Sequence, residues 1–249
     1  MAPVAGAMTA RWRCLSALGG LLLLVAPVSA QAPAPPAEEI VARLMEANRQ
    51  RDQRLAGYRV ERRYHLKNEL YSKNGEMQVE VAFEAPDQVR FTVRAQQGSG
   101  MLNKRVFGRM MEGEQESLRP ENKRRSAMTP ENYDFRLAGE ERVEGRRAYR
   151  LEITPRREDT FLFAGAIWVD AEDFAVVRAT GRPAKRPSFW TRKIDFLRTF
   201  KKVGPFWLPA RTESVTEVFL FGTSWATIEN GDYRVRLQPV APAPPQGSE

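Results

Sequence analysis

Cysteine and histidine are almost absent from this sequence of 249 residues, and their scarcity excludes several kinds of chemistry. The chain has one cysteine, Cys14, and one histidine, His65. Zinc and copper sites are built mainly from these residue types, so we expect no such metal site. A Ser-His-Asp triad would have to use His65, and no Gly-x-Ser-x-Gly stretch accompanies it. We expect His65 to be solvated, because it falls on the polar side of its strand.

Phosphate-binding and cofactor-binding motifs are also missing. There is no Walker-type loop and no Gly-x-Gly-x-x-Gly stretch after a strand. Asp170, Glu172 and Asp173 form an acidic cluster, but they lack the spacing of an EF-hand, and a hairpin turn explains them better. Paired carboxylates of the glycosidase kind stay open, although no particular pair is indicated. We therefore predict a protein that is not an enzyme, with no cofactor, no metal and no catalytic residues.

The N-terminal residues predict export. A basic start with Arg11 and Arg13 precedes a short apolar run, and Val28-Ser29-Ala30 is a small-residue ending. This pattern is typical of a secretory signal peptide over residues 1–30, cleaved before Gln31, and the apolar run is too short for a comfortable membrane span. An uncleaved anchor is the alternative. Cys14 lies inside the predicted peptide, so we expect a periplasmic protein without a thiol, a disulfide or a lipid anchor.

The net charge of +8 leaves the choice of partner open. A leader containing Arg11 and Arg13 would account for two of these charges. The remaining basic residues gather in turns near residues 122–125, 145–147 and 185–186, and scattered basic turns usually form a solvated surface. They could also attract an anionic membrane surface or an acidic partner protein. Nucleic acid is not expected, because the exported chain has no recognisable nucleic-acid module.

Proline-rich segments bracket the predicted fold. Residues 31–36 and 239–249 are predicted to be extended tails. Between them, residues 37–238 contain no repeat and no linker, so we predict one domain and a monomer. A helix is predicted over residues 37–55, because four apolar side chains share one face. These are Ile40, Val41, Leu44 and Met45.

Beyond this helix the hydrophobic period becomes two. Val89, Phe91 and Val93, for example, alternate with Arg90 and Thr92. This alternation is typical of antiparallel strands with one buried and one solvated face. We predict about ten strands joined by short loops. Turns are predicted at residues 73–76, 85–87, 144–146 and 170–173.

Residues 98–139 interrupt the alternation, because they are polar, irregular and rich in methionine. Thr129 and Pro130 predict the start of a short helix that runs to about Leu137. A long insertion of this kind is often a lid or a binding loop, and a disordered surface loop is the alternative.

These elements predict the fold class. It is mainly β with a few helices (α+β), an incomplete antiparallel β-barrel formed by a curved sheet of about ten strands. The N-terminal helix and a lid segment cover the sheet. Two helices cannot cover so wide a sheet tightly, so part of its concave face should be left for an apolar ligand. The predicted lining of this lipid cavity is Leu44, Met45, Val81, Phe83, Phe91 and Val93.

Short motifs in the C-terminal half add a family resemblance. They are the stretch Asn132-Tyr133-Asp134-Phe135-Arg136-Leu137, the hairpin Ile167-Trp168-Val169-Asp170, and the strand Gly204-Pro205-Phe206-Trp207-Leu208-Pro209. Their order resembles the outer-membrane lipoprotein-sorting proteins of the LolA-like superfamily, over most of residues 37–238. The resemblance implies an incomplete barrel whose cavity holds acyl chains of lipoproteins or lipids.

The resemblance favours a periplasmic lipid or lipoprotein carrier, a transport chaperone without enzymatic activity. The alternative is a periplasmic regulatory, sensor or scaffold protein with the same fold. No functional motif matches residue by residue, so no binding residue is carried over from the family.

Overall fold

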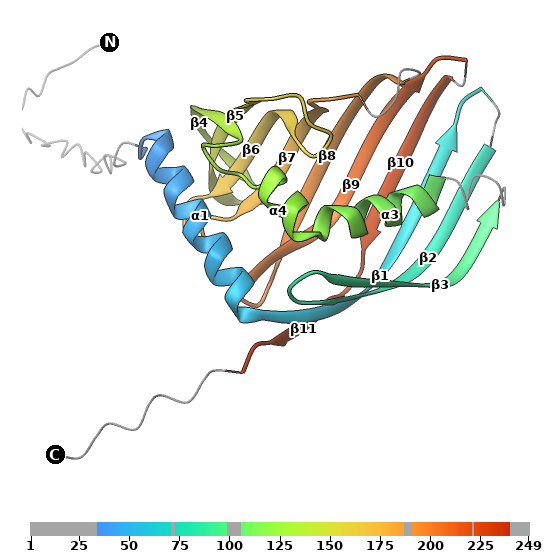
Figure 1. The fold of residues 1–249 in the computed structure, drawn as a ribbon, viewed down its shortest axis with the longest axis horizontal. Helices are drawn as coiled ribbons and strands as arrows, with labels where there is room; N and C mark the ends of the chain where they lie inside the picture. The colour runs from blue at the N-terminus through green and yellow to red at the C-terminus, as the bar shows by residue number, and fades with distance from the viewer. Residues whose placement is uncertain (1–33, 71–72, 99–105, 187–190, 221, 240–249) are drawn as a thin grey trace, which may run out of the picture. The chain divides into compact units, whose positions relative to one another are not determined.

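One antiparallel sheet dominates the fold (Figure 1). The structure is a computed structural model that describes residues 34–70, 73–98, 106–186, 191–220 and 222–239. Within these residues the sheet has eleven strands in the order β3-β2-β1-β10-β9-β8-β7-β6-β5-β4, and β11 pairs with the first part of β1. The strands at the two ends, β3 and β4, do not pair with each other, so the sheet is an open half-barrel, as the sequence predicts.

The elements follow one another in chain order with short connections. The helices are α1 (Ala37–Arg54), α3 (Gly108–Leu118) and α4 (Pro120–Ser126). The first strands are β1 (Leu55–Asn68), β2 (Lys73–Glu84), β3 (Gln88–Gly98), β4 (Tyr133–Val143) and β5 (Arg146–Pro155). The later strands are β6 (Phe163–Asp170), β7 (Val176–Pro183), β8 (Thr191–Val203), β9 (Phe206–Val218), β10 (Gly222–Asn230) and β11 (Arg234–Leu237).

The N-terminal helix forms where its apolar face predicts it. Ile40, Val41 and Leu44 are buried, whereas Met45 at the edge of that face is 38% exposed. Acidic side chains in the first turn and basic ones in the last match the helix dipole. The helix ends at Arg54, because Leu55 is already extended and begins β1.

Two large apolar cores lie between the helices and the sheet, and a smaller cluster of Leu55, Phe206 and Leu208 adjoins the second. The first core joins α1 to strands β4–β7, through residues such as Leu44, Leu151 and Ile167. The second core joins β1, β2 and β10 to the segment that leads into α3. Its buried members are Val60, Tyr64, Leu66, Met77, Val79, Val81, Phe107 and Ala226. We call the side of the sheet that carries both cores the covered face, and the opposite side the open face.

The open face has a smaller apolar cluster around Trp168 and Trp207. Arg150 and Arg178 each place a guanidinium near the Trp168 ring, and its indole N–H donates to Glu141. Leu197, Val215 and Trp225 remain 37–38% exposed. Val215 and Trp225 are directly opposed on β9 and β10, so they form a small exposed apolar pair on this face.

Three of the four predicted turns lie where the sequence places them, at residues 85–87, 144–146 and 170–173. Glu144 and Gly145 both have positive φ, as the tight hairpin between β4 and β5 requires. The turn predicted at residues 73–76 is wrong, because these residues already pair with β1. Gly75 instead faces Gly98 of β3, where the two backbones approach closely.

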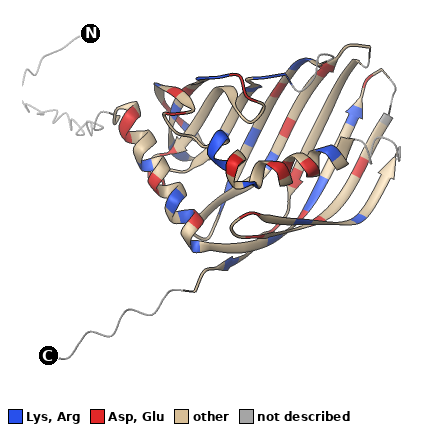
Figure 2. Cartoon of the chain, in the orientation of Figure 1, with Lys and Arg blue, Asp and Glu red and all other residues tan. Residues whose placement is uncertain are grey.

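The segment between β3 and β4 contains two helices that the sequence pattern did not predict, α3 and α4. Both carry charges of each sign (Figure 2). The helix predicted from Thr129 to Leu137 is wrong. Thr129 begins a turn, and Tyr133 starts β4, because the alternation of Tyr133, Phe135 and Leu137 pairs with β5. Residues 99–105 of the predicted lid lie outside the described residues.

Candidate functional site

A buried arginine occupies the covered face of β1. The alternation of the strand places Arg62 between the apolar side chains of Val60 and Tyr64, and it is only 4% exposed. Its Nε donates to Oδ1 of Asn230 over 2.8 Å, and its Nη1 donates to the Tyr64 hydroxyl over 3.2 Å. A buried charge is tolerated only when it is paired and hydrogen-bonded.

The counter-charge comes from helix α3. Nη1 of Arg62 donates to Oε2 of Glu114 over 2.5 Å, and Nη2 donates to Oε1 over 3.3 Å, so the ion pair is bidentate. Burial alone would lower the pKa of Arg62, but the carboxylate of Glu114 and the hydroxyl of Tyr64 outweigh burial and raise it above its ordinary value. The pair therefore fastens the middle of α3 to the sheet.

A second arginine, Arg198, points to the same side of the sheet from β8. It lies directly opposite Ala179 of β7, which belongs to the first core, and opposite Thr212 of β9. Directly opposed residues of antiparallel strands share a face, so Arg198 is on the covered face. Its Nε donates to Oγ1 of Thr212 over 3.1 Å.

The surroundings of Arg198 are crowded but not sealed. Burial is the main cause that lowers the pKa of Arg198, the positive charge of Arg62 lowers it further, and Glu114 raises it. The side chain nevertheless remains exposed to solvent. Both observations agree with a guanidinium that protein surrounds on several sides while water still reaches it. We call the group Arg62, Glu114, Arg198, Thr212 and Asn230 the polar centre.

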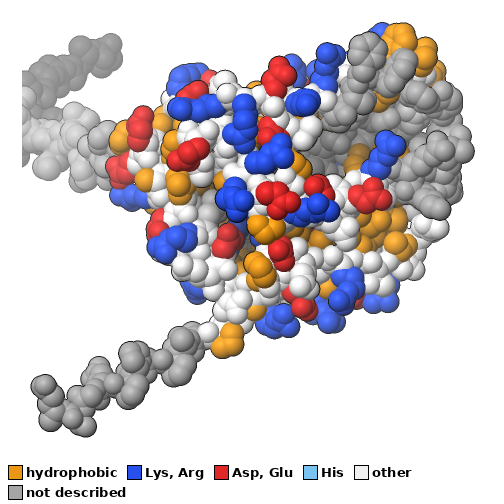
Figure 3. Space-filling view, in the orientation of Figure 1, with side chains coloured by type: hydrophobic (Ala, Val, Ile, Leu, Met, Phe, Trp, Pro, Cys, Tyr) orange, Lys and Arg blue, Asp and Glu red, His pale blue; other side chains and the backbone are white. Residues whose placement is uncertain are grey.

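A strip of partly exposed side chains separates the two cores at the polar centre. It consists of Ile194, Phe196 and Arg198 on β8 with Thr212 and Ser214 on β9, and we call it the central strip. All five point to the covered face, and none is buried. The helices α3 and α4 cross in front of these strands (Figure 1), and their outer surface carries basic and acidic side chains side by side (Figure 3). The partial exposure of these five side chains shows that water reaches the central strip, although α3 and α4 cross in front of it.

A cleft of about 380 Å³ opens between α3 and β3. Its lining mixes apolar and polar side chains: Val89, Arg90, Phe91, Gly108, Met111, Glu112 and Gln115. Phe91 and Met111 also pack against the second core, so the cleft is continuous with apolar contacts. Such a volume lies in the range of small-ligand pockets.

The residues predicted to line one cavity are distributed over different parts of the covered face. Leu44 is fully buried in the first core, and Val81 is fully buried in the second. Phe83 is partly buried and stacks on Tyr58 with a ring-centroid distance of 5.2 Å.

Two of the remaining three predicted residues are exposed. Phe91 lines the cleft between α3 and β3. Val93 is 47% exposed and Met45 is 38% exposed. The four strand residues therefore share the covered face, but with Leu44 and Met45 of α1 they do not form one continuous lining.

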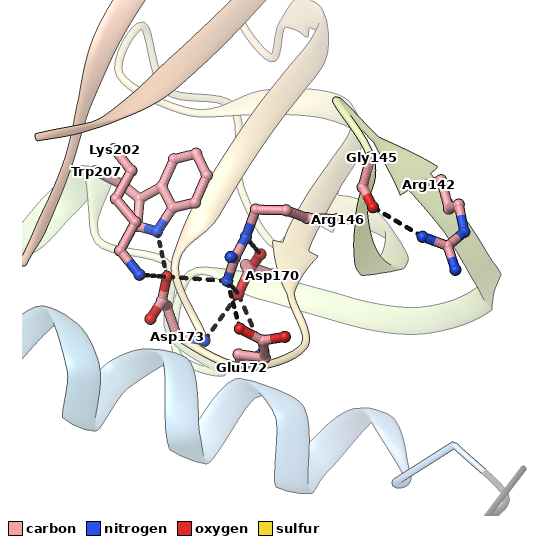
Figure 4. Close-up of polar contacts among 8 residues, drawn as sticks. All are labelled: Arg142, Gly145, Arg146, Asp170, Glu172, Asp173, Lys202 and Trp207. Atoms are coloured by element: carbon pink, nitrogen blue, oxygen red, sulfur yellow. Dashed lines mark hydrogen bonds and ion pairs between the residues drawn. The ribbon is translucent and has the colours of Figure 1, made fainter.

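The acidic turn between β6 and β7 is a structural ion-pair network (Figure 4). Asp170 is completely buried and accepts hydrogen bonds from Nε and Nη2 of Arg146, over 2.6 and 2.9 Å. Its Oδ1 also accepts from the backbone N–H groups of Glu172 and Asp173. Asp173 in turn accepts from Lys202 and from the Trp207 indole. All three carboxylates thus already accept hydrogen bonds from groups of the protein.

The other chemistry-bearing side chains offer little. His65 lies on the open face and pairs with Glu76, with 3.5 Å between Nδ1 and Oε1. Within the described ranges, no group of three or more His, Cys, Asp or Glu residues is arranged to hold a metal ion. The helices of the described part are also too short or too polar to cross a membrane.

Sequence reasoning missed both arginines of the polar centre. Arg62 follows Val60 and precedes Tyr64 at the apolar positions of its strand, and Arg198 follows Phe196 in the same way. A charged residue at an apolar position of the alternation was the signal that could have identified both arginines as functional candidates. The carboxylate partner could not be found in this way, because α3 itself was not predicted.

Comparison with known proteins gives a family but no activity. The model of a family described as "Family of unknown function (DUF5686)" matches residues 52–228. No protein with a curated description matches the chain.

Several solved structures match with low identity. A DUF1329 family protein from Desulfovibrio piger ATCC 29098 is 15% identical, with a TM-score of 0.41 and coverage of 81% of this chain and 94% of that chain. A LolA superfamily protein from Nitrosomonas europaea is 13% identical, with a TM-score of 0.38 and coverage of 83% and 96%. MucB, in its complex with MucA from Pseudomonas aeruginosa, is 14% identical, with a TM-score of 0.27 and coverage of 77% and 92%.

The superfamily that the sequence motifs resemble is thus among the matches, as predicted. All three TM-scores lie below 0.5.

Proposed function

We propose that this chain, which belongs to the DUF5686 family because the family model covers more than two thirds of it, binds an acyl chain on its covered face. In this proposal it serves as a periplasmic carrier of lipids or lipoproteins, and it catalyses no reaction. The periplasmic location and the cleavage before Gln31 are part of the same proposal.

The central strip is the observation that carries this proposal. A sheet face between two apolar cores is normally sealed, because each Å² of exposed apolar surface costs about 25 cal/mol. Here Ile194 and Phe196 stay partly exposed, although they lie on the covered face. An acyl chain laid along β8 and β9 would cover these side chains and connect the two cores.

The way in which α3 is held also supports the proposal. None of its residues is fully buried, and its contact with the second core is made by two partly buried side chains, Met110 and Met111. Its other attachments are polar: the ion pair between Glu114 and Arg62, and a hydrogen bond of 3.4 Å from Gln115 to the Val89 carbonyl. A cover without a fully buried side chain can move at a lower cost than a core helix, which a carrier needs for loading and release.

A binding assay with a blocking variant tests the proposal. A fluorescent fatty-acid probe should bind the mature protein, and affinity should rise with chain length, since each buried methylene contributes roughly 0.8 kcal/mol. The variant Ser214→Trp places an indole in the central strip and should weaken binding at least tenfold, which is about 1.4 kcal/mol. Val215→Trp, at the next position on the open face, should bind like the wild type.

The outcomes separate the candidate functions. If no probe of any chain length binds, or if both variants behave alike, the carrier proposal fails and a scaffold role replaces it. Native mass spectrometry of protein from a periplasmic extract would identify the natural ligand. Bound acyl lipid would support a carrier or a sensor over a scaffold, and N-terminal sequencing of the same sample would test cleavage before Gln31.

A further inference from the structure

We infer that the ligand of the covered face carries an anionic headgroup, a carboxylate or a phosphate, and that Arg198 binds it. This inference rests on the proposed function and names the chemical class of its ligand. The acyl chain would then run from Arg198 along β8 over Phe196 and Ile194.

The orientation of Arg198 is the first argument. Thr212 accepts the hydrogen bond from Nε over 3.1 Å and thereby fixes the plane of the guanidinium. Among the residues that the structure describes, neither Nη1 nor Nη2 of Arg198 has a hydrogen-bond partner. A guanidinium with both terminal nitrogens free presents a planar fork, which matches the two oxygens of a carboxylate or phosphate.

The balance of charge is the second argument. Three cationic side chains lie on this part of the covered face: Arg62, Arg198 and Lys201. Lys201 is on this face because the strand pairing is irregular between Thr199 and Phe200, and it lies opposite Leu208, which packs in the cluster with Tyr58. Glu114 is engaged in the bidentate pair with Arg62, and Lys201 donates to the backbone carbonyls of Asn230 and Gly231, over 3.2 and 2.6 Å. In the described part of the chain, Arg198 is thus the cation of this group without an acceptor for its terminal nitrogens. An anionic ligand would complete the set.

The position of the apolar side chains is the third argument. Residues two apart on a strand point to the same face, about 6.7 Å from each other. Phe196 and Ile194 are the next two same-face positions on β8, and both are partly exposed. In the other direction the same-face neighbourhood is occupied by Lys201 and by Tyr233, whose hydroxyl donates to the Pro209 carbonyl over 2.7 Å. The headgroup would therefore lie at Arg198, and the acyl chain would lie over Phe196 and Ile194.

Probes of equal chain length and different headgroup test the inference. We would measure binding of a hexadecyl fatty acid, the corresponding alkyl phosphate and the neutral alcohol to the mature protein. Both anionic probes should bind at least about tenfold more tightly than the alcohol, as expected when charge-assisted hydrogen bonds are added. The ratio between the fatty acid and the phosphate shows which headgroup the site prefers.

Matched variants assign the effect to one side chain. Arg198→Gln should remove the preference for anionic probes, and Arg198→Lys should restore part of it because the charge returns without the fork. Arg211→Gln removes the same charge from the open face of β9 and should leave the preference intact. Unfolding midpoints verify that each variant folds.

The failure of this inference is distinguishable from failure of the proposed function. If the alcohol binds as tightly as the acid, or if Arg198→Gln keeps the preference, the headgroup assignment is wrong. Under that result a loss of binding in Ser214→Trp would still support the acyl site. If no probe binds the wild-type protein, both proposals fall.

Discussion

Asp170 shows how one buried carboxylate can organise a turn. It accepts two hydrogen bonds from Arg146 and two from backbone N–H groups, and its side chain is only 1% exposed. Burial alone would raise the pKa of Asp170, but these hydrogen bonds outweigh it and hold the pKa below its ordinary value. The aspartate of the Ile-Trp-Val-Asp motif is therefore a structural residue.

We expect Asp170→Asn to lower the free energy of unfolding by about 2–4 kcal/mol, because it leaves Arg146 without its main partner in a largely buried pair. Chemical denaturation would measure the change. Glu172→Gln is the matched control, since Glu172 also contacts Arg146 but its side chain is 79% exposed. It should cost less than about 0.5 kcal/mol. Equal losses in the two variants would contradict a structural role specific to Asp170.

Acid should weaken the fold through the same group. A carboxylate whose pKa is lower in the folded state contributes stability that is complete above the pKa of the unfolded chain, about 4. The contribution is then lost as the pH falls through the lower folded value. Asp159 acts in the same direction: burial would raise its pKa, and hydrogen bonds from the Phe161 amide and Arg125 outweigh it.

Denaturation midpoints measured between pH 6 and pH 3 should therefore decline toward acid in the wild type and decline less in Asp170→Asn. Parallel curves for the two proteins would show that Asp170 does not titrate with folding.

The sequence predicts the side of the sheet for most strand residues but not the role of the exceptions. Alternation correctly places Val79 and Val81 in a core. It also places Arg62 there, where a charge needs a partner that lies 52 positions later in the chain. No local pattern identifies such a partner, because the contact depends on how α3 crosses the sheet.

Strands β6 and β7 approach each other through a pair of glycines. Gly165 lies opposite Gly181, and a Cβ added at Gly165 would stand 2.0 Å from the Thr180 carbonyl oxygen. A Cβ added at Gly181 would stand 2.3 Å from the Ala164 carbonyl oxygen. The backbones of β6 and β7 could move apart to make room for a Cβ only by breaking hydrogen bonds between the two strands.

We expect Gly165→Ala to destabilise the protein by about 2–4 kcal/mol through this overlap with the neighbouring backbone. Thermal unfolding would measure it. Gly113→Ala in α3 is the control, because a Cβ there meets no atom within 4 Å and alanine favours helix by about 1 kcal/mol. A neutral Gly165→Ala would show that β6 and β7 can separate.

Strands were easier to predict than helices in this chain, for a physical reason. Residues 133–137 are the exception, because a helix was predicted there, but the two-residue period of Tyr133, Phe135 and Leu137 is set by burial on one side and forms β4. The capping signal at Thr129 acts only on its own turn, and the pairing of β4 with β5 overrides it. Helix α3 has no fully buried residue, and it lies in a polar, methionine-rich segment in which a helix was expected only after Thr129.

The half-barrel as a whole contains two large cores and a smaller cluster beside the second, with the central strip between the two large cores. The strip is joined to the first core by Phe196, which packs against Phe163, and to the second by the backbone pairing of β9 with β10. We therefore expect the two halves to open as partly independent units. The sequence predicts an open, curved sheet with an incomplete cover, but it does not reveal this division, because the same two-residue apolar alternation runs through the strands of both cores.

Hydrogen exchange of two cavity variants would test this division. Val79→Ala should accelerate exchange mainly in β1–β3 and α3, and Ile167→Ala mainly in α1 and β5–β7, each with a loss of about 1–4 kcal/mol. A bound acyl ligand on the central strip should slow exchange in both halves. Uniform acceleration by either variant would instead indicate one cooperative unit.

The place of β1 in the sheet sets the order in which the chain can fold. Its first edge pairs with β2, but its second edge pairs with β10 and β11, and Arg62 stands opposite Asn230. A chain emerging from its N-terminus therefore presents β1 with one unpaired edge until nearly all of the domain has appeared. Contacts this distant in sequence form slowly. The second edge of β1 can therefore be paired only when the chain is almost complete.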